Sequence, residues 1–164
     1  MKKIYSVINQ KGGVGKTTTT INLATSLSAI NKKVLLVDAD PQGNASTGIG
    51  IAYKDRLPSL YELIIKRGLD EAAIKKTIVP NLSIISANTN LAAAEVELTN
   101  VGKREFVLAD ILLKAKSFDF ILIDCPPALG FLTINSLVAS NSVIVPLQSE
   151  FFALEGMSSL VNTI

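Results

Sequence analysis

The sequence predicts an α/β fold in which a mostly parallel, twisted sheet is flanked by helices. Short apolar runs alternate with helical patterns along the 164 residues, and this alternation is typical of repeated βαβ units. Hydrophobic residues make up 48% of the chain and charged residues only 18%. That balance is expected when parallel strands are covered on both faces, because such strands are apolar throughout. The length suits one domain over residues 1–164.

Five short apolar runs are predicted to be strands, and they cover residues 4–8, 34–37, 82–86, 120–123 and 142–146. A helix is expected from about Lys16 to Ile30. Within it Leu23, Leu27 and Ile30 recur at the spacing of a buried stripe, with Ala24 beside them. Further helical patterns cover residues 59–67, 70–76, 91–98 and 104–115, and another begins at residue 153.

Charge and cysteine content narrow the function classes only a little. The net charge of +2, from 16 basic and 14 acidic residues, is too near balance to predict a nucleic-acid partner on its own. Basic pairs such as Lys32-Lys33 and Lys75-Lys76 are, taken singly, typical of solvated helix ends and loops. The single cysteine, Cys125, rules out an internal disulfide framework and agrees with a reducing cytosol. No apolar stretch approaches the roughly 20 residues that span a bilayer.

A glycine-rich loop joins the first predicted strand to the first predicted helix. Its sequence is Lys11-Gly12-Gly13-Val14-Gly15-Lys16-Thr17-Thr18. Because glycines have no Cβ, the backbone N–H groups can turn toward phosphate oxygens, and the helix N-terminus adds a partial positive charge. In such a loop Lys16 reaches the β- and γ-phosphates, the Thr17 hydroxyl is a ligand for Mg²⁺, and Thr18 is placed to donate to the α-phosphate.

The loop departs from the standard pattern G-x-x-x-x-G-K-[ST], whose first glycine would fall where Gln10 stands. A second lysine, Lys11, follows instead. A dinucleotide-binding turn would need a third glycine at position 18, which is Thr18. A plain strand-to-helix turn would need neither the two lysines nor the paired threonines. A nucleoside triphosphate is therefore the favoured ligand.

With Lys11 at its start, the loop resembles the deviant Walker A box of the ParA/MinD family of ATPases. The run from Asp40 to Asn44 and the segment around Glu95 and Glu97 resemble the chromosome- and plasmid-partitioning branch of that family. This resemblance covers nearly the whole chain and implies a P-loop NTPase fold that binds ATP and Mg²⁺. It also leads us to expect that the 164 residues lack the C-terminal portion of the family's domain.

Two predicted strands end in carboxylates at the edge where parallel sheets hold ligands. The strand at 34–37 leads into Asp38 and Asp40, and the strand at 120–123 leads into Asp124 in the form of a Walker B motif. Asp124 is predicted to hold Mg²⁺ through water. The resemblance implies that Asp38 also belongs to the Mg²⁺ shell and that Asp40 positions the attacking water. As bare residues, Asp38 and Asp40 could instead start a turn, where Asp is common.

The resemblance further implies a slow ATPase that works as a switch in DNA partitioning. ATP would join two protomers into a homodimer, and Lys11 of each would reach the phosphates of the other, much as an arginine finger does. Lys11, Lys16 and Asp40 are thus the expected catalytic residues. The dimer would bind DNA without sequence preference, and a ParB-type centromere-binding partner would stimulate hydrolysis. A cytoplasmic, nucleoid-associated protein is expected.

Two alternatives share the same nucleotide site. A membrane-associated division-site ATPase of the MinD type would need an amphipathic helix beyond Ile164. An iron–sulfur cluster carrier would need several cysteine ligands. Cys125 could serve it only across a symmetric dimer, with two more ligands supplied from elsewhere.

Overall fold

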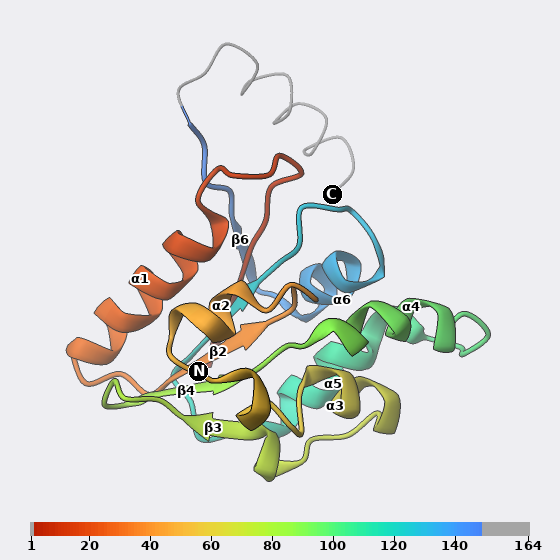
Figure 1. The fold of residues 1–164 in the computed structure, drawn as a ribbon, viewed down its shortest axis with the longest axis horizontal. Coiled ribbons are helices and arrows are strands. Elements are labelled where there is room, and N and C mark those ends of the chain that lie inside the picture. The colour runs from red at the N-terminus through yellow and green to blue at the C-terminus, as the bar shows by residue number, and fades with distance from the viewer. Residues whose placement is uncertain (1, 149–164) are drawn as a thin grey trace.

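A computed structural model describes residues 2–148 as a single sheet between two layers of helices (Figure 1). The strand order is β3-β4-β2-β5-β1-β6. β1, β2, β4, β5 and β6 run parallel, and β3 pairs antiparallel with β4. α1 and α2 cover one face of the sheet, and α3, α4, α5 and α6 cover the other. The predicted α/β class with a mostly parallel sheet is confirmed.

All five predicted strands are present to within two residues at either end. The strands span Lys3–Val7 (β1), Val34–Asp38 (β2), Ile74–Lys76 (β3), Leu82–Ile85 (β4), Phe120–Asp124 (β5) and Ser142–Ile144 (β6). Every residue of β2 is buried. This pattern is expected of a central parallel strand that is covered on both faces.

Six α-helices and four short 3₁₀ turns connect the strands within residues 2–148. The helices span Lys16–Ala29 (α1), Asn44–Gly48 (α2), Leu60–Lys66 (α3), Ala94–Glu97 (α4), Val107–Lys114 (α5) and Phe131–Ala139 (α6). The 3₁₀ turns lie at Tyr53–Asp55, Glu71–Ala73, Thr89–Ala93 and Arg104–Phe106. None of the described helices has both the length and the apolar character needed to cross a membrane.

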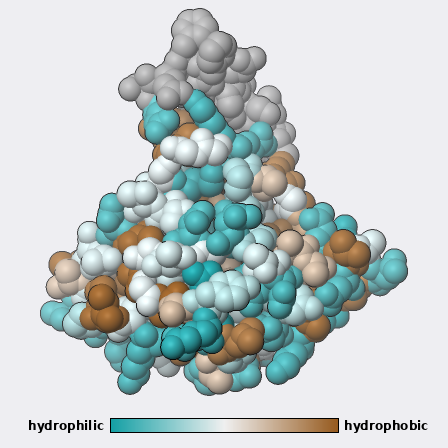
Figure 2. Space-filling model, viewed as in Figure 1, coloured by the Kyte–Doolittle hydropathy of each residue, from teal (hydrophilic) through white to brown (hydrophobic). Residues whose placement is uncertain are grey.

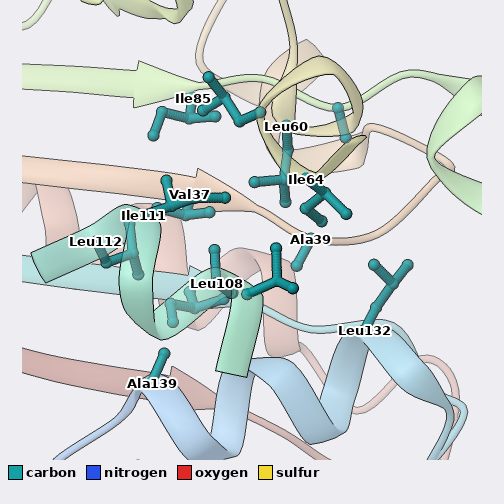
Figure 3. Close-up of a cluster of buried hydrophobic side chains, with 14 of the residues drawn as sticks. Val37, Ala39, Leu60, Ile64, Ile85, Leu108, Ile111, Leu112, Leu132 and Ala139 are labelled. Atoms are coloured by element: carbon teal, nitrogen blue, oxygen red, sulfur yellow. The ribbon is translucent and has the colours of Figure 1, made fainter. Parts of the chain in front are cut away.

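Side chains of the central strands alternate between two hydrophobic cores. Leu35 and Val37 of β2 pack into the larger core, which is closed by α3, α5 and α6. Figure 3 shows that core, with side chains of α3 and α5 directed toward Val37 and Ile85. Leu36 of β2 points the other way and packs with Ala24 of α1. The surface seen in Figure 2 shows hydrophobic residues scattered among hydrophilic ones, as expected when the apolar side chains lie mainly inside.

The buried face of α1 differs from the predicted stripe. The residues that it buries lie four apart and are Lys16, Thr20, Ala24 and Ser28. Leu23 and Leu27 are only half-buried, and Ile30 is 63% exposed, so the prediction was wrong for Ile30. The Thr20 and Ser28 hydroxyls donate to backbone carbonyls four residues earlier, which lets small polar side chains lie inside the packed face.

Three other differences concern element type. The helix predicted at 70–76 was wrong, because only Glu71–Ala73 makes a 3₁₀ turn and β3 follows at once. Pairing of β3 with β4 outweighs local helical pattern there. α2 and α6 were not predicted; both are short and follow glycines, Gly43 and Gly130. The helix predicted to begin at residue 153 lies outside the described residues.

β1, β2 and β5 end at one level of the sheet. Val7 of β1 and Asp38 of β2 both pair with Asp124 of β5. The loops that follow these ends contain the three predicted motifs. Segments far apart in sequence therefore meet at the C-terminal edge of the sheet, where parallel α/β folds hold ligands.

Candidate nucleotide-binding site

The glycine-rich loop leaves the start of α1 open to a ligand. Gly13 and Gly15 have φ angles of 77° and 87°, in the left-handed region, which costs glycine little. Gly15 is the N-cap of α1, and no side chain caps the helix there. The first amides of a 14-residue helix therefore face outward with the positive end of its dipole. This arrangement can bind an anion such as a phosphate.

A pocket of about 390 Å³ lies in front of these amides. It brings together residues from the glycine-rich loop, from the loop after β2 and from the loop after β5. They are Gly12, Gly13, Gly15, Lys16, Thr17, Thr18, Asp40, Gln42, Asn44 and Pro127. Most of the predicted loop residues thus line one cavity. Val14 does not, because its side chain is buried in the protein.

The two lysines of the loop have different surroundings. Lys16 is only 8% exposed, and its Nζ donates to the carbonyl oxygen of Lys11 at 3.0 Å. Burial lowers the pKa of Lys16, while Asp124 and Asp40 act in the opposite direction. Lys11 is exposed and is not among the residues that line the pocket. Its backbone N–H donates to Asn9 Oδ1 at 2.9 Å, which fixes the start of the loop.

Asp124 accepts hydrogen bonds from two threonines of α1. Thr17 Oγ1 donates to its Oδ2 at 2.7 Å and Thr20 Oγ1 to its Oδ1 at 3.0 Å. Burial raises the pKa of Asp124 to about 6, against the lowering effect of these two hydrogen bonds. The role of Thr17 was predicted from the sequence, whereas that of Thr20 was not. The signal was present, because Thr20 stands three residues after Thr17 and so lies on the same helix face.

Asp38 and Asp40 take different positions despite their spacing. Asp40 lines the pocket, and its Oδ1 accepts from the Gln42 N–H at 2.9 Å. Asp38 is fully buried behind it. Asp38 Oδ2 accepts from both the N–H and the hydroxyl of Ser46 at 2.7 Å, and Ser46 Oγ accepts from the Ala87 N–H. Asp38 therefore joins β2 to α2 and to the end of β4.

Burial raises the pKa of Asp38 to about 7, against the effect of its hydrogen bonds from Ser46. The nearby charge of Asp124 raises it further. Asp38 does not line the pocket, and the oxygens of its carboxylate already accept from Ser46 and from the Asp40 N–H. The ligand role expected of Asp38 stays a prediction.

Arg56, which was not predicted as a functional residue, supports the loop that carries Asp40. Arg56 is 5% exposed, and its guanidinium donates to Ala87 O at 3.2 Å and to Thr47 Oγ1 at 2.6 Å. Thr47 Oγ1 in turn donates to the carbonyl of Gly43. A Cβ at Gly43 would lie 2.2 Å from Arg56 Nη1. The buried guanidinium of Arg56 therefore supports this loop from the protein interior. No short sequence motif indicates this role.

Cys125 follows Asp124 but is not part of the pocket lining. Its thiol is buried, and burial raises its pKa to about 12. A neutral, buried thiol packs as a small apolar side chain, whereas cluster ligation needs the thiolate. This environment agrees with the packing role that its position suggests.

The fold and the pocket together define a P-loop nucleotide-binding protein, and comparison with known proteins places the chain in a family. Residues 2–164 match the family model described as an AAA domain, so the chain belongs to that family. It is 50% identical to the sporulation initiation inhibitor protein Soj of Bacillus subtilis, covering 100% of this chain and 65% of that protein. It is 46% identical to the chromosome partitioning protein ParA of Caulobacter vibrioides, covering 99% and 62% respectively.

Solved structures agree with this assignment. The cobyrinic acid a,c-diamide synthase of Mycobacterium smegmatis, with bound ATP analog and magnesium, matches with a TM-score of 0.94 at 39% identity, over 100% of this chain and 67% of that one. A putative plasmid partition protein of Borrelia burgdorferi bound to AMPPNP matches with a TM-score of 0.85 at 30% identity, over 99% and 68%. The predicted resemblance to ParA/Soj-type ATPases is confirmed. The chain spans less than two thirds of the length of these curated relatives.

Proposed function

We propose that the chain binds MgATP and hydrolyses it slowly, as a switch in DNA partitioning. The observation that carries this proposal is the meeting of three segments at one pocket. They are the open start of α1 with Lys16 and Thr17, the loop after β2 with Asp40, and the loop after β5 with Pro127. Asp124, at the end of β5, accepts a hydrogen bond from Thr17 of the pocket wall. Relatives named as partitioning proteins support the biological role. Solved structures with an ATP analog, ADP or AMPPNP support the ligand.

The residues at the start of α1 would bind the triphosphate. The uncapped amides after Gly15 offer hydrogen bonds and a positive dipole. Lys16 adds a full charge, and its ammonium already lies inside the loop, where it donates to Lys11 O. A phosphate oxygen would replace that carbonyl as acceptor. Thr18, on the pocket wall, would donate to the α-phosphate.

The oxygen ligands fit Mg²⁺. Thr17 and Asp124 offer a hydroxyl and a carboxylate 2.7 Å apart, and magnesium prefers one or two carboxylates together with substrate phosphates over a full protein cage. Within residues 2–148 no group of three or more Asp, Glu, His or Cys side chains could hold a metal, which agrees with such a sparse set. When bound, Mg²⁺ would neutralise charge that develops on the phosphates. Asp38, beside Asp124 in the sheet, would belong to the Mg²⁺ shell as the family resemblance implies, and its Oδ1 also accepts from the Asp40 N–H.

Asp40 would orient the water that attacks the γ-phosphate. Its carboxylate lies at the pocket wall and is held by the Gln42 N–H. Lys16 would stabilise the charge on the transferred phosphoryl oxygens, since such reactions are catalysed by positioning and charge. Lys11 is exposed at the rim. We propose that it reaches the phosphates of a second protomer in an ATP-dependent homodimer.

The proposed partners follow from the same relatives. DNA would be bound without sequence preference, and a ParB-type centromere-binding protein would stimulate hydrolysis. The protein would act in the cytoplasm, on the nucleoid. Relatives named for chromosome and plasmid partition support these proposals.

Two substitutions test the nucleotide site. Lys16→Ala should abolish binding of a fluorescent ATP analog, because the buried cation inside the loop is lost. Asp40→Ala should keep ATP but accumulate dimer, because the water is no longer oriented. Binding titrations, light scattering after size exclusion and phosphate release measure these outcomes. Lys54→Ala, exposed and outside the pocket, is the control and should behave as the unmodified chain does.

The opposite results would overturn the assignments separately. An Asp40→Ala variant that releases phosphate at the normal rate removes Asp40 from its role. A Lys16→Ala variant that binds the analog normally removes the loop as the phosphate site.

A further inference from the structure

Two paths of hydrogen bonds leave the guanidinium of Arg56 and meet again at the carboxylate of Asp38. One path runs through the loop after β2 and includes the backbone of Asp40, and the other runs from the end of β4 to α2. Together they close a ring, which we call the Arg56 ring. Its members are Arg56, Thr47, Gly43, Asp40, Asp38, Ser46 and Ala87.

The first path contains Asp40. Arg56 Nη2 donates to Thr47 Oγ1 at 2.6 Å, and this hydroxyl donates to Gly43 O at 3.1 Å. The Gly43 N–H donates to Asp40 O at 2.9 Å, and the Asp40 N–H donates to Asp38 Oδ1 at 3.3 Å. The first path therefore holds both the N–H and the carbonyl of Asp40.

The second path reaches the same carboxylate by another route. Arg56 Nη1 donates to Ala87 O at 3.2 Å. The Ala87 N–H donates to Ser46 Oγ at 3.0 Å, and Ser46 Oγ donates to Asp38 Oδ2 at 2.7 Å. In both paths every donor lies on the Arg56 side of its bond and every acceptor on the Asp38 side. Hydrogen bonds that are aligned in this way polarise and strengthen one another.

Stability alone is a poor explanation for a cation at this position. Arg56 is 5% exposed, it forms no ion pair with any described residue, and its Nε has no hydrogen-bond partner among them. Its Cζ lies over the Tyr53 ring, 5.4 Å from the ring centre. Burying a charge without a carboxylate partner is costly, and apolar side chains of similar volume often stabilise a fold as well or better. The guanidinium does what an apolar side chain cannot do, because it holds acceptors on two separate segments at once.

The loop after β2 needs such support if Asp40 orients a water. A carboxylate in that role has to stay within about 0.5 Å of its working position. The Gln42 N–H holds the side chain of Asp40, but the loop turns at Gly43, and glycine restricts the backbone least. The first path crosses this turn. It therefore fixes the part of the loop that the Gln42 contact does not.

We propose that Arg56 is a positioning residue for Asp40. Its guanidinium fixes the loop after β2 in the conformation from which the Asp40 carboxylate orients the attacking water. This inference rests on the proposed ATP hydrolysis and extends it to a side chain outside the nucleotide pocket, since Arg56 does not line that pocket. Loss of Arg56 should therefore slow hydrolysis and leave nucleotide binding in place.

The first test separates kcat from nucleotide affinity in the full chain with MgATP. Arg56→Met removes the guanidinium but keeps a long side chain. It should lower kcat by about tenfold to a hundredfold and change the dissociation constant of a fluorescent ATP analog by less than about threefold. Arg56→Lys keeps the charge but not the planar fork, so its kcat should lie between those of Arg56→Met and the unmodified chain. Urea unfolding measures the folded fraction, to which each kcat is referred.

The second test breaks the first path without touching the buried cation. Thr47 is exposed, so Thr47→Val should fold and should lower kcat by about fivefold through the loss of one hydrogen-bonded link. Thr47→Ser, which keeps the hydroxyl, should restore kcat. Thr99→Val is the matched control, because the exposed Thr99 also donates to a carbonyl four residues earlier, that of Glu95, but stands outside the Arg56 ring. Its kcat should be unchanged.

Three results would overturn the inference. A normal kcat in Arg56→Met would show that Asp40 keeps its position without the guanidinium. Equal kcat values in Thr47→Val and Thr99→Val would show that the first path does not act on hydrolysis, and this comparison decides alone if Arg56→Met does not fold. An affinity that falls in step with kcat in Arg56→Met would assign Arg56 to ATP binding.

These failures are distinguishable from a failure of the proposed function. In each of them the unmodified chain still releases phosphate from ATP, so the proposed ATPase activity stands. A folded, unmodified chain that binds the analog but releases no phosphate would instead refute that activity, and the role of Arg56 with it.

Discussion

Two buried carboxylates, Asp38 and Asp124, lie side by side where β2 and β5 end. Their pKa values are raised from 3.8 to about 7 and about 6, chiefly by burial. The folded chain therefore binds protons more tightly than the unfolded chain between about pH 4 and pH 7. By linkage, stability falls as the pH rises through that window.

We expect the metal-free chain to lose stability between pH 4.5 and pH 7.5 on this account, by about 1–3 kcal/mol for Asp124. Urea unfolding in the presence of a chelator at a series of pH values measures the slope. Asp124→Asn should make the slope shallower, while the part that comes from Asp38 remains. Asp110→Asn, which removes an exposed carboxylate on α5, should leave the slope unchanged. A free energy of unfolding that rises with pH over this range in the unmodified chain would contradict the prediction.

Gly43 is a second residue whose environment makes a sharp prediction. Gly43 and Gly50 both have positive φ angles, 66° and 90°. A Cβ at Gly43 would meet the Arg56 guanidinium at 2.2 Å, whereas a Cβ at Gly50 would meet nothing within 4 Å. Alanine is strained by the backbone at either site, at about 1 kcal/mol.

Gly43→Ala should therefore destabilise the chain more than Gly50→Ala, by about 1–2 kcal/mol, because the Arg56 hydrogen bonds are also disturbed. Chemical denaturation gives both values. In an Arg56→Met background the difference between the two glycines should shrink. Equal costs in both backgrounds would show that Arg56 does not hold the loop.

At the residue scale, the sequence predicts the side chains that belong to local motifs. Lys16, Thr17 and Thr18 form a contiguous run in the loop, and all three line the pocket together with Asp40. Arg56 and Ser46 could not be predicted. Their roles come from contacts with Ala87, which is 31 and 41 residues away, and no spacing rule links such positions.

At the scale of elements, α5 separates buried from exposed leucines. Leu108 is 1% exposed in the core between α3, α6 and the sheet, whereas Leu113 on the same helix is 65% exposed. Leu108→Ala should cost about 2–5 kcal/mol of stability, since it removes buried methyl groups and leaves a cavity. Leu113→Ala should cost less than about 0.5 kcal/mol. Urea unfolding of the two variants compares them, and similar values would contradict the described packing.

Apolar runs predicted the central strands well because each is buried on both faces. Edge elements were harder. β3 has only three residues, two of which are half-buried, and its local sequence favours a helix. It is a strand because it pairs with β4. α6 is buried along much of its length. It therefore lacks the exposed polar face that makes a helical period recognisable in a sequence.

At the scale of the whole molecule, nucleotide binding should stabilise the fold, because the pocket draws on three segments that separate on unfolding. At MgATP one hundred times above its dissociation constant, the gain is about 2.7 kcal/mol. Thermal unfolding followed by circular dichroism, with and without MgATP, measures the shift in midpoint. Lys16→Ala should show no shift and Lys54→Ala the full one. An equal shift in both would mean that the ligand binds elsewhere.

The position of β5 between β1 and β2 has a consequence for how the protein is made. Lys16 and Asp38 leave the ribosome long before Asp124 does, yet β1 and β2 do not touch and cannot form their site as a pair. Only when β5 has emerged and inserted between them does Asp124 meet Thr17. A nascent chain should therefore gain affinity for nucleotide abruptly, after residue 124 has cleared the exit tunnel. Nucleotide binding and the insertion of β5 are then one event during synthesis of the chain.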